Sequence, residues 1–469
     1  MSFEPQMTQI FRIVSRLAAD AASLLDTSSD QHVAAARAIR QEHRSNSRNL
    51  RNLRFPERDR KQRIQENPMF NLETPKRLKP LIHQAHQIGA EMFRPISRKY
   101  DRLEHTAPVE LEMLGSLLHG MNRAGGKGAG AGKLKQDGGE DAGARNGANM
   151  AAVLGMIELC WGDVGLALSI PGQGLGNAAI AAVANEEQRR RFDGRWVAMA
   201  ITEPGAGSDS AAIRATAERD GDDYVLNGEK IYVTAGERAD ALVVWASVDR
   251  SRGRAAIKAF LVEKDRPGLT LERLEHKLGI RASDTAAFRL ENCRVPAENL
   301  LGSPEVDTGK GFAGVMQTFD NTRPIVAAMA IGLTRAAIEE TRRILGEAGV
   351  DLDYRRPRTH GHAAAAKLME CEADWEAAKL LTLRAAWMAD NGRPNALEAS
   401  MCKAKAGRTA VDTALACVEL CGAAGYGETE LLEKWARDAK ILDIFEGTQQ
   451  IQLLIVARRL LGKSSAELK

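Results

Sequence analysis

The chain has 469 residues, with 65 Lys and Arg against 62 Asp and Glu, a formal net charge of +3, and 44% hydrophobic residues. This composition is typical of a globular protein and excludes fibrous and membrane-embedded classes. At roughly 150 residues per domain, the length predicts about three domains. No apolar run approaches the ~18 residues of a membrane span, and no signal-peptide pattern is present. We therefore expect a cytoplasmic protein without a membrane span.

The cysteines argue against a disulfide framework and against a zinc site. Six of them are sparse for a chain of this length, and none forms a C-x-x-C pair. Cys417 and Cys421 stand one helical turn apart, but no histidine or further cysteine near them has zinc-ligand spacing. We therefore expect buried, reduced thiols and no metal site.

The first 75 residues form a basic N-terminal extension. Residues 37–63 contain ten Lys or Arg against three acidic residues. The arginines recur every three or four positions, so they would form one stripe if the segment is helical. A solvated or inter-subunit helix face is favoured over a nucleic-acid surface, because no aromatic residues or nucleic-acid motif accompany the stripe. We expect no nucleic-acid partner.

Residues 76–195 predict an N-terminal helical domain with a glycine-rich insertion at 124–147. The pattern is helical over 76–118, and the insertion is nearly free of apolar residues, which indicates a flexible loop. Gly128 to Lys133 is similar to a phosphate loop, but the first glycine of that motif is missing and Leu134 stands where Ser or Thr belongs. We favour a mobile loop that covers a site.

Residues 196–305 predict a β-barrel or sandwich domain, because short β-rich runs alternate with turns. Asp223–Leu226 and Lys230–Thr234 flank Asn227-Gly228, a pair typical of a hairpin with a type I′ turn. Further strands are expected at 241–248, 259–262 and 286–290.

Residues 306–469 predict a C-terminal four-helix bundle. Long amphipathic stretches occupy 325–347, 362–390, 397–421 and 449–461. The expected fold class is therefore α+β, with an N-terminal all-α domain, a middle β-barrel or sandwich domain and a C-terminal four-helix bundle.

Three stretches combine turn residues with reactive side chains. In the stretch from Thr202 to Ser208, one proline and two glycines make a tight turn whose bare backbone can approach a ligand between two hydroxyls. Tyr232-Val233-Thr234 places a ring and a hydroxyl at a strand end. Glu446 precedes a helix with Thr448 as its expected N-cap and Gly462 as its C-cap. A carboxylate beside apolar groups suits general-base chemistry, but a solvent-facing loop glutamate explains the pattern equally well.

These stretches resemble the signatures of the acyl-CoA dehydrogenase family. Residues 202–209 are similar to the first signature, and residues 437–462, with the core Glu446-Gly447-Thr448, are similar to the second. Further stretches similar to the family stand between them in the same order, at 227–230, 279–283, 295–302 and 319–323. The resemblance covers residues from about 80 to 469.

The resemblance implies an FAD enzyme that forms a trans double bond between Cα and Cβ of an acyl-CoA thioester. A glutamate would remove the α-proton while hydride passes to flavin N5, and electron-transferring flavoprotein would reoxidise the flavin. It also implies a homodimer or homotetramer whose subunits complete each other's FAD sites, and a place in fatty acid β-oxidation and lipid metabolism. An acyl-CoA oxidase that uses oxygen, and a non-catalytic acyl-CoA or FAD binding relative, are the alternatives.

The resemblance implies roles for individual residues, according to their positions in the matching motifs. Glu446 would be the base, and its backbone N–H would help bind the thioester oxygen. Relatives with the base on an earlier helix have it at the position of Thr322, which leaves Glu446 as the base consistent with the family. The implied FAD contacts are Ile201, Thr202, Tyr232, Thr234, Gly422, Thr448 and Gln450. The implied substrate contacts are Ser208, Asp320, Arg323 and Gly447.

The sequence departs from the family at three places. Tyr232 stands where many relatives have tryptophan. The family's Gln-x-x-Gly-Gly reads Glu419-Leu420-Cys421-Gly422-Ala423, which brings a carboxylate where the FAD diphosphate is expected. The usual Arg-x-x-Phe-Gly is not recognisable in 352–358, and our hypothesis is that Arg355, Arg356 or Arg358 supplies its charge. Acyl chain length and branching cannot be read from the sequence.

Overall fold

The computed structural model describes residues 74, 76–112, 114–115, 147–172, 174–306, 313–355, 359–463 and 467, with the backbone alone for 313–321. The basic stripe of 37–63 and the glycine-rich insertion, apart from Gly147, lie outside this part. None of the described helices is both long enough and apolar enough to cross a bilayer. All six cysteines are unpaired, and only Cys421 is not fully buried.

Helices open the described chain. α4 (Lys79–Gln87), the π-helix Ile88–Phe93 and α5 (Arg94–Arg102) follow one another without a break. α7 (Ala148–Gly162) packs against them at a point where two glycines face each other. A Cβ added to Gly162 would lie 2.6 Å from the Cα of Gly89, so this close crossing requires glycine. Three short helices, α8 (Val164–Ala167), α9 (Leu175–Val183) and α10 (Glu186–Arg191), then lead to the sheet.

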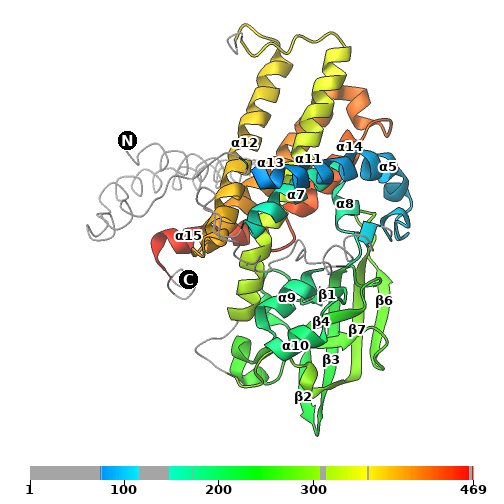
Figure 1. Cartoon of the computed structure of the whole chain (residues 1–469), viewed down its shortest axis with the longest axis vertical. Helices are drawn as coiled ribbons and strands as arrows, with labels where there is room; N and C mark the ends of the chain where they lie inside the picture. Colours follow the sequence, from blue (N-terminus) through cyan, green and yellow to red (C-terminus); the bar gives the residue numbers. More distant parts are fainter. Residues whose placement is uncertain are drawn as a thin grey trace, which may run out of the picture. The chain divides into compact units, whose positions relative to one another are not determined.

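A seven-stranded sheet forms the middle of the chain (Figure 1). Its strands are β1 (Val197–Ala200), β2 (Thr216–Asp220), β3 (Asp223–Thr234), β4 (Ala241–Ser247), β5 (Ile257–Glu263), β6 (Leu269–Leu274) and β7 (Thr285–Pro296). They follow the order β1-β4-β2-β3-β7-β6, and β5 pairs with β4. Ala179 and Ile180 of α9 pack on Val197 and Val243 and so cover one face of the sheet. The expected middle β domain is confirmed.

The predicted hairpin at Asn227-Gly228 is wrong. β3 runs through this dipeptide as one strand, and the chain reverses earlier, between Asp220 and Asp223, where β2 pairs with β3. Asn227 pairs with Thr216 of β2, and Gly228 pairs with Leu290 of β7, across an irregularity in the register. Pairing on both sides of β3 outweighs the local turn preference, so the dipeptide forms a bulge instead.

The bulge makes Gly228 intolerant of a side chain. Its φ is +143°, and an added Cβ would lie 2.8 Å from the backbone of Ala215. We expect Gly228→Ala to lower the free energy of unfolding by about 1–3 kcal/mol, measured by urea denaturation. Gly346→Ala is the control, because a Cβ there, near the end of a helix, meets nothing within 4 Å. Equal stability of the two variants would contradict a strained bulge.

Five helices complete the chain: α11 (Ala313–Glu347), α12 (Ala363–Asp390), α13 (Ala396–Tyr426), α14 (Leu432–Leu442) and α15 (Gln449–Leu461). The four expected helical stretches coincide with parts of α11, α12, α13 and α15, except that residue 362 is the N-cap of α12. α14 was not expected as a separate helix. Their common core joins Ala327 of α11, Ala385 of α12, Ala410 of α13 and Trp435 of α14 to Ile157 of α7. The C-terminal helical bundle is thereby confirmed.

The caps expected for α15 are present. The Thr448 hydroxyl accepts a hydrogen bond from the Ile451 N–H at 3.4 Å, which satisfies one free donor of the first turn. Gly462 ends the helix with a φ of +65°.

α14 is seated on the turn that connects β6 to β7. A Cβ added to Gly279 would lie 2.5 Å from the carbonyl carbon of Arg437, so the two backbones touch. The Ile280 N–H donates to Asp438 Oδ1 at 2.5 Å, and Arg437 Nη1 donates to the Leu278 carbonyl at 3.1 Å. This contact fixes α14, and α14 leads directly to Glu446.

A buried ion cluster also holds α14 in place. Lys434 Nζ is 2.6 Å from Asp163 Oδ2 and 2.5 Å from Asp438 Oδ2, and all three side chains are almost fully buried. The Ser97 hydroxyl also donates to Asp163. Burial alone would lower the pKa of Lys434, but the two carboxylates outweigh it and hold that pKa above its ordinary range. Lys434 therefore keeps its positive charge in the folded protein.

Candidate active site

The loop between α14 and α15 holds Glu446 in an unusual backbone conformation. Glu446 has a φ of +57° and Gly447 a φ of +92°, so two successive residues lie in the left-handed region. This region is uncommon for a residue with a side chain. Gln452 Nε2 donates to the carbonyls of Glu446 (3.1 Å) and Gly447 (3.2 Å) and so holds the turn. A Cβ on Gly447 would overlap the Gln452 amide, which explains the glycine.

The Glu446 carboxylate is held on one oxygen and unbonded on the other. Oε2 accepts a hydrogen bond from the Thr322 hydroxyl of α11 at 2.5 Å. Oε1 is shielded from solvent and accepts no hydrogen bond from the residues that the structure describes. Burial raises the pKa of Glu446, while Thr322, Arg323 and Lys403 oppose the rise. Such a carboxylate has an available oxygen and an increased proton affinity, which suits a general base.

Lys403 of α13 lies beneath this turn and was not singled out in the sequence. Its side chain is fully buried, and Nζ donates to the Gly447 carbonyl at 2.7 Å. Burial lowers the pKa of Lys403 to about 8, although Asp443 and Glu446 act to raise it. Lys403 is the one charged residue between Ala399 and Ala404 and has small neighbours at helical spacing, a pattern that could have identified it as buried.

Arg323 adds a second buried cation to this site. It is 3% exposed, and its Nη1 lies 3.5 Å from the Ser400 hydroxyl one turn before Lys403. Both Arg323 and Lys403 favour the ionised form of Glu446. The site therefore combines one carboxylate with two buried cations from different helices.

The turn after β1 is anchored to β3. The Ile231 N–H donates to the Thr202 carbonyl at 2.9 Å. The buried Lys230 Nζ bonds to Glu203 Oε1 at 2.6 Å and to the Ile201 carbonyl at 3.2 Å, and burial lowers the pKa of Lys230 to about 8. Glu203 also accepts the N–H groups of Arg214 and Ala215, at 2.5 and 3.0 Å. These bonds bring Thr202 beside the strand end that carries Tyr232 and Thr234.

That strand end presents an aromatic ring to solvent. Tyr232 is 61% exposed and has a φ of +55°, because it lies in the irregular register between Lys230 and Val233. The hydroxyls of Thr202 and Thr234 are partly buried and bond to none of the other described residues. A planar ligand with acceptor atoms could therefore contact the ring and both hydroxyls.

The structure thus places the predicted site residues in two groups. Glu446, Gly447, Thr448 and Arg323 lie together at the α14–α15 loop. Ile201, Thr202, Tyr232 and Thr234 gather near β1 and β3, with Ser208 exposed in the adjoining turn. Their roles in binding stay predictions.

The remaining predicted contacts lie at exposed positions or outside the description. Gly422 is exposed at a kink in α13, with a φ of +54°, and Gln450 is exposed in the first turn of α15. The side chain of Asp320 lies outside the described part. Arg355 is 90% exposed and pairs with Asp353 at 2.8 Å, and Arg356 and Arg358 are outside the described residues.

Comparison with known proteins gives consistent matches along the chain. Residues 198–293 match the family model described as the acyl-CoA dehydrogenase middle domain, and residues 309–461 match that of the acyl-CoA dehydrogenase C-terminal domain. A short-chain specific acyl-CoA dehydrogenase of Mus musculus mitochondria is 41% identical over 268 residues, which are 56% of this chain and 62% of the relative. The chain thus spans less than two thirds of that relative's length.

Two further matches cover more of the relatives. A cyclohex-1-ene-1-carbonyl-CoA dehydrogenase of Geobacter metallireducens is 38% identical over 280 residues, which are 59% of this chain and 72% of the relative. The solved structure of butyryl-CoA dehydrogenase from Megasphaera elsdenii is 30% identical with a TM-score of 0.72, and the match covers 84% of this chain and all of that one. The chain belongs to the acyl-CoA dehydrogenase family.

Proposed function

We propose that the protein is an FAD-dependent acyl-CoA dehydrogenase that introduces a trans double bond between Cα and Cβ of an acyl-CoA thioester. The observation that carries the proposal is the Glu446 carboxylate. Its Oε1 is shielded and accepts no hydrogen bond within the described part of the chain, while Oε2 is held by Thr322. Relatives that act on acyl-CoA thioesters, by their names, support the substrate class.

The residues on β1 and β3 fit a flavin. The free hydroxyls of Thr202 and Thr234 match the polar edge of an isoalloxazine ring, and the exposed Tyr232 ring can pack on it. Thr448 and the first turn of α15 suit a diphosphate, since helix N-termini favour anions. We infer that these residues hold FAD together with Ile201, Gly422 and Gln450. When bound, FAD would accept the β-hydrogen of the substrate as hydride.

Glu446 would remove the α-proton through its unbonded Oε1. The Glu446 backbone N–H donates to no acceptor among the described residues, so it is free to bind the thioester oxygen as negative charge develops there. Gly447, next to the base in the same loop, is a further proposed substrate contact. Arg323 and Lys403 favour the ionised form of Glu446 and so oppose the effect of burial on its pKa. Arg323, Asp320 and Ser208 are the proposed contacts to the CoA arm.

The Thr322 hydroxyl should tune the base. Thr322→Val removes a hydrogen bond to the ionised carboxylate, so the pKa of Glu446 rises. Glu446 acts only when ionised, so the acidic limb of the kcat/KM profile should move to higher pH by roughly one to two units. Thr334→Val is the control, because the Thr334 hydroxyl on the same helix bonds to the Ala330 carbonyl. If the acidic limb of the kcat/KM profile lies at the same pH in Thr322→Val and Thr334→Val, Thr322 does not tune the pKa of the base.

The decisive experiment is an anaerobic titration of the purified protein with a panel of acyl-CoA esters. A bound flavin gives a visible spectrum, and bleaching by one chain class would establish FAD, dehydrogenation and substrate range together. Protein with flavin that no ester bleaches would contradict the proposed reaction. Colourless protein that also fails to take up added FAD would contradict the cofactor and favour a non-catalytic binding relative.

We further propose electron-transferring flavoprotein as the electron acceptor, a homodimer or homotetramer as the assembly, and the cytoplasm as the location. Rapid reoxidation of the bleached flavin by that flavoprotein, and slow reoxidation by air, is the expected result. Rapid production of hydrogen peroxide in air would instead identify an acyl-CoA oxidase.

A further inference from the structure

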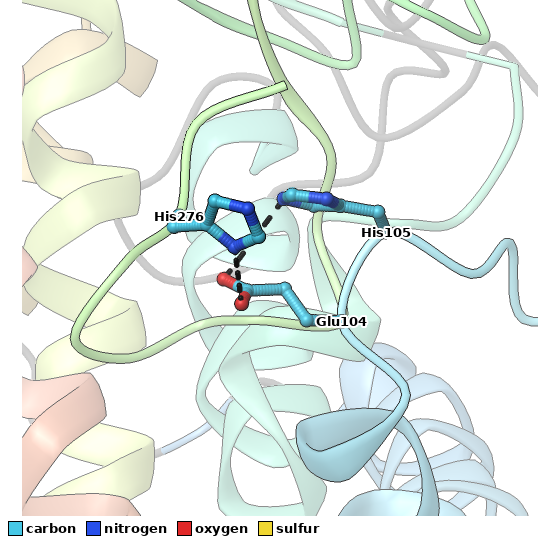
Figure 2. A group of neighbouring side chains, drawn as sticks. All are labelled: Glu104, His105 and His276. Carbon is cyan, nitrogen blue, oxygen red and sulfur yellow. Dashed lines mark hydrogen bonds and ion pairs between the residues drawn. The ribbon is translucent and has the colours of Figure 1, made fainter. Parts of the chain in front are cut away.

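Glu104, His105 and His276 meet outside the proposed active site (Figure 2). Glu104 and His105 follow α5, and His276 follows β6, so the cluster joins two segments that are distant in the sequence. Their possible ligand atoms all lie within 4.8 Å of one another. His276 Nδ1 is 3.1 Å from Glu104 Oε2, and His105 Nε2 is 4.0 Å from Glu104 Oε1.

This spacing is close to that of a metal site. Zinc binds histidine nitrogen and carboxylate oxygen at about 2.0–2.2 Å with tetrahedral geometry, which places the ligand atoms roughly 3.3 Å apart. The 3.1 Å between His276 Nδ1 and Glu104 Oε2 is close to this value, and the ligand atoms of all three residues lie within 4.8 Å of one another, so small side-chain rotations would bring them to one ion. The His276 side chain is 83% exposed, so its ring can rotate toward an ion at little cost.

A neighbouring backbone N–H orients one of the three ligands. The Lys277 N–H donates to Glu104 Oε1 at 2.9 Å and fixes the carboxylate, as outer partners do in metal sites. His105 Nε2 lies 3.1 Å from the Glu275 carbonyl oxygen. Binding an ion through Nε2 would replace this hydrogen bond with a coordinate bond and leave the ring proton on Nδ1.

We propose that Glu104, His105 and His276 form a binding site for a divalent transition-metal ion, with Zn²⁺ as the best match. Two imidazoles and one carboxylate favour Zn²⁺ over Mg²⁺ or Ca²⁺, which prefer oxygen ligands. The exposure of His276 leaves a coordination position open to water. Lys277 and Arg281 add positive charge near Glu104, so we expect micromolar affinity rather than permanent binding. This proposal departs from the expectation of no metal site.

A bound ion would act on the segment between β6 and β7, against which α14 packs. Residues 275–277 continue into the turn of Leu278 and Gly279 on which α14 is seated. The ion would link residues 275–277 to the end of α5, and this link would stabilise the turn on which α14 packs. The inference does not depend on the proposed dehydrogenase reaction.

The test is calorimetric titration of the full-length, EDTA-treated and dialysed protein with Zn²⁺. We expect a micromolar site with one ion per chain, and at least a tenfold weaker site in His276→Ala and in Glu104→Gln. His105→Asn should weaken it equally while retaining a residue that tolerates the φ of +67°. His360→Ala, at an exposed histidine outside the cluster, should bind as the wild type does.

Two results would overturn the site. One is wild-type affinity in His276→Ala, which would place the ion elsewhere in the chain. The other is no binding by the wild-type protein below millimolar Zn²⁺. Because His276 is largely exposed, this variant is expected to fold, and its circular dichroism spectrum and melting temperature without metal check that it does.

Discussion

Glu446→Gln should retain FAD but slow flavin reduction by acyl-CoA by a factor of about 10²–10⁴, the usual contribution of a general base. The amide has nearly the shape of the carboxylate and can still contact the Thr322 hydroxyl, so the fold is expected to be unchanged. It cannot accept the α-proton. Anaerobic stopped-flow measurement of flavin absorbance gives the rate, and the spectrum before mixing gives the FAD content.

The matched control for this variant is Glu347→Gln. Glu347 is an exposed carboxylate at the end of α11 that pairs with Arg343 at 2.9 Å, and its loss should leave the rate unchanged. Flavin reduction at the normal rate in Glu446→Gln would move the base elsewhere. A variant without FAD would instead show that Glu446 mainly supports the cofactor site.

Lys434→Met should lower the free energy of unfolding by about 3–5 kcal/mol, the usual cost of removing one partner from a buried ion pair. Asp163 and Asp438 would then lie buried without their cation, and one of them would have to take up a proton. Urea denaturation followed by circular dichroism measures the change.

Lys405→Met is the comparison for a surface pair. Lys405 is 2.6 Å from Asp374, whose side chain is 62% exposed, so its loss should cost less than about 1 kcal/mol. Similar losses in the two variants would show that the buried cluster contributes no more than a solvent-exposed pair. Added salt should weaken the surface pair more than the buried cluster.

The regular elements of the fold were largely predictable, because hydrophobic periodicity is a local property of the chain. The periods of the long helices and the apolar runs of β4 and β5 appear directly in the sequence. In β3, prediction from the local sequence fails. Asn227-Gly228 has the strongest local preference for a turn, but hydrogen bonds to β2 on one side and β7 on the other keep the strand extended.

The site was predictable only where it is continuous in sequence. Glu446, Gly447 and Thr448 share one loop, so their motif and the cap of α15 could be identified together. Thr322 and Lys403 contact that loop from α11 and α13, more than 40 positions away in each case. The sequence contains no local pattern for such contacts, since they depend on how the helices pack.

The contact at Gly279 bears on how substrate reaches the site. There, the turn after β6 and α14 touch backbone to backbone, with hydrogen bonds from Ile280 and Arg437 on either side. A hinge needs residues that can change φ and ψ freely, and this junction has no space for such a change. We therefore expect the sheet and α14 to move as one rigid body, so that access opens by local loop motion and not by domain rotation.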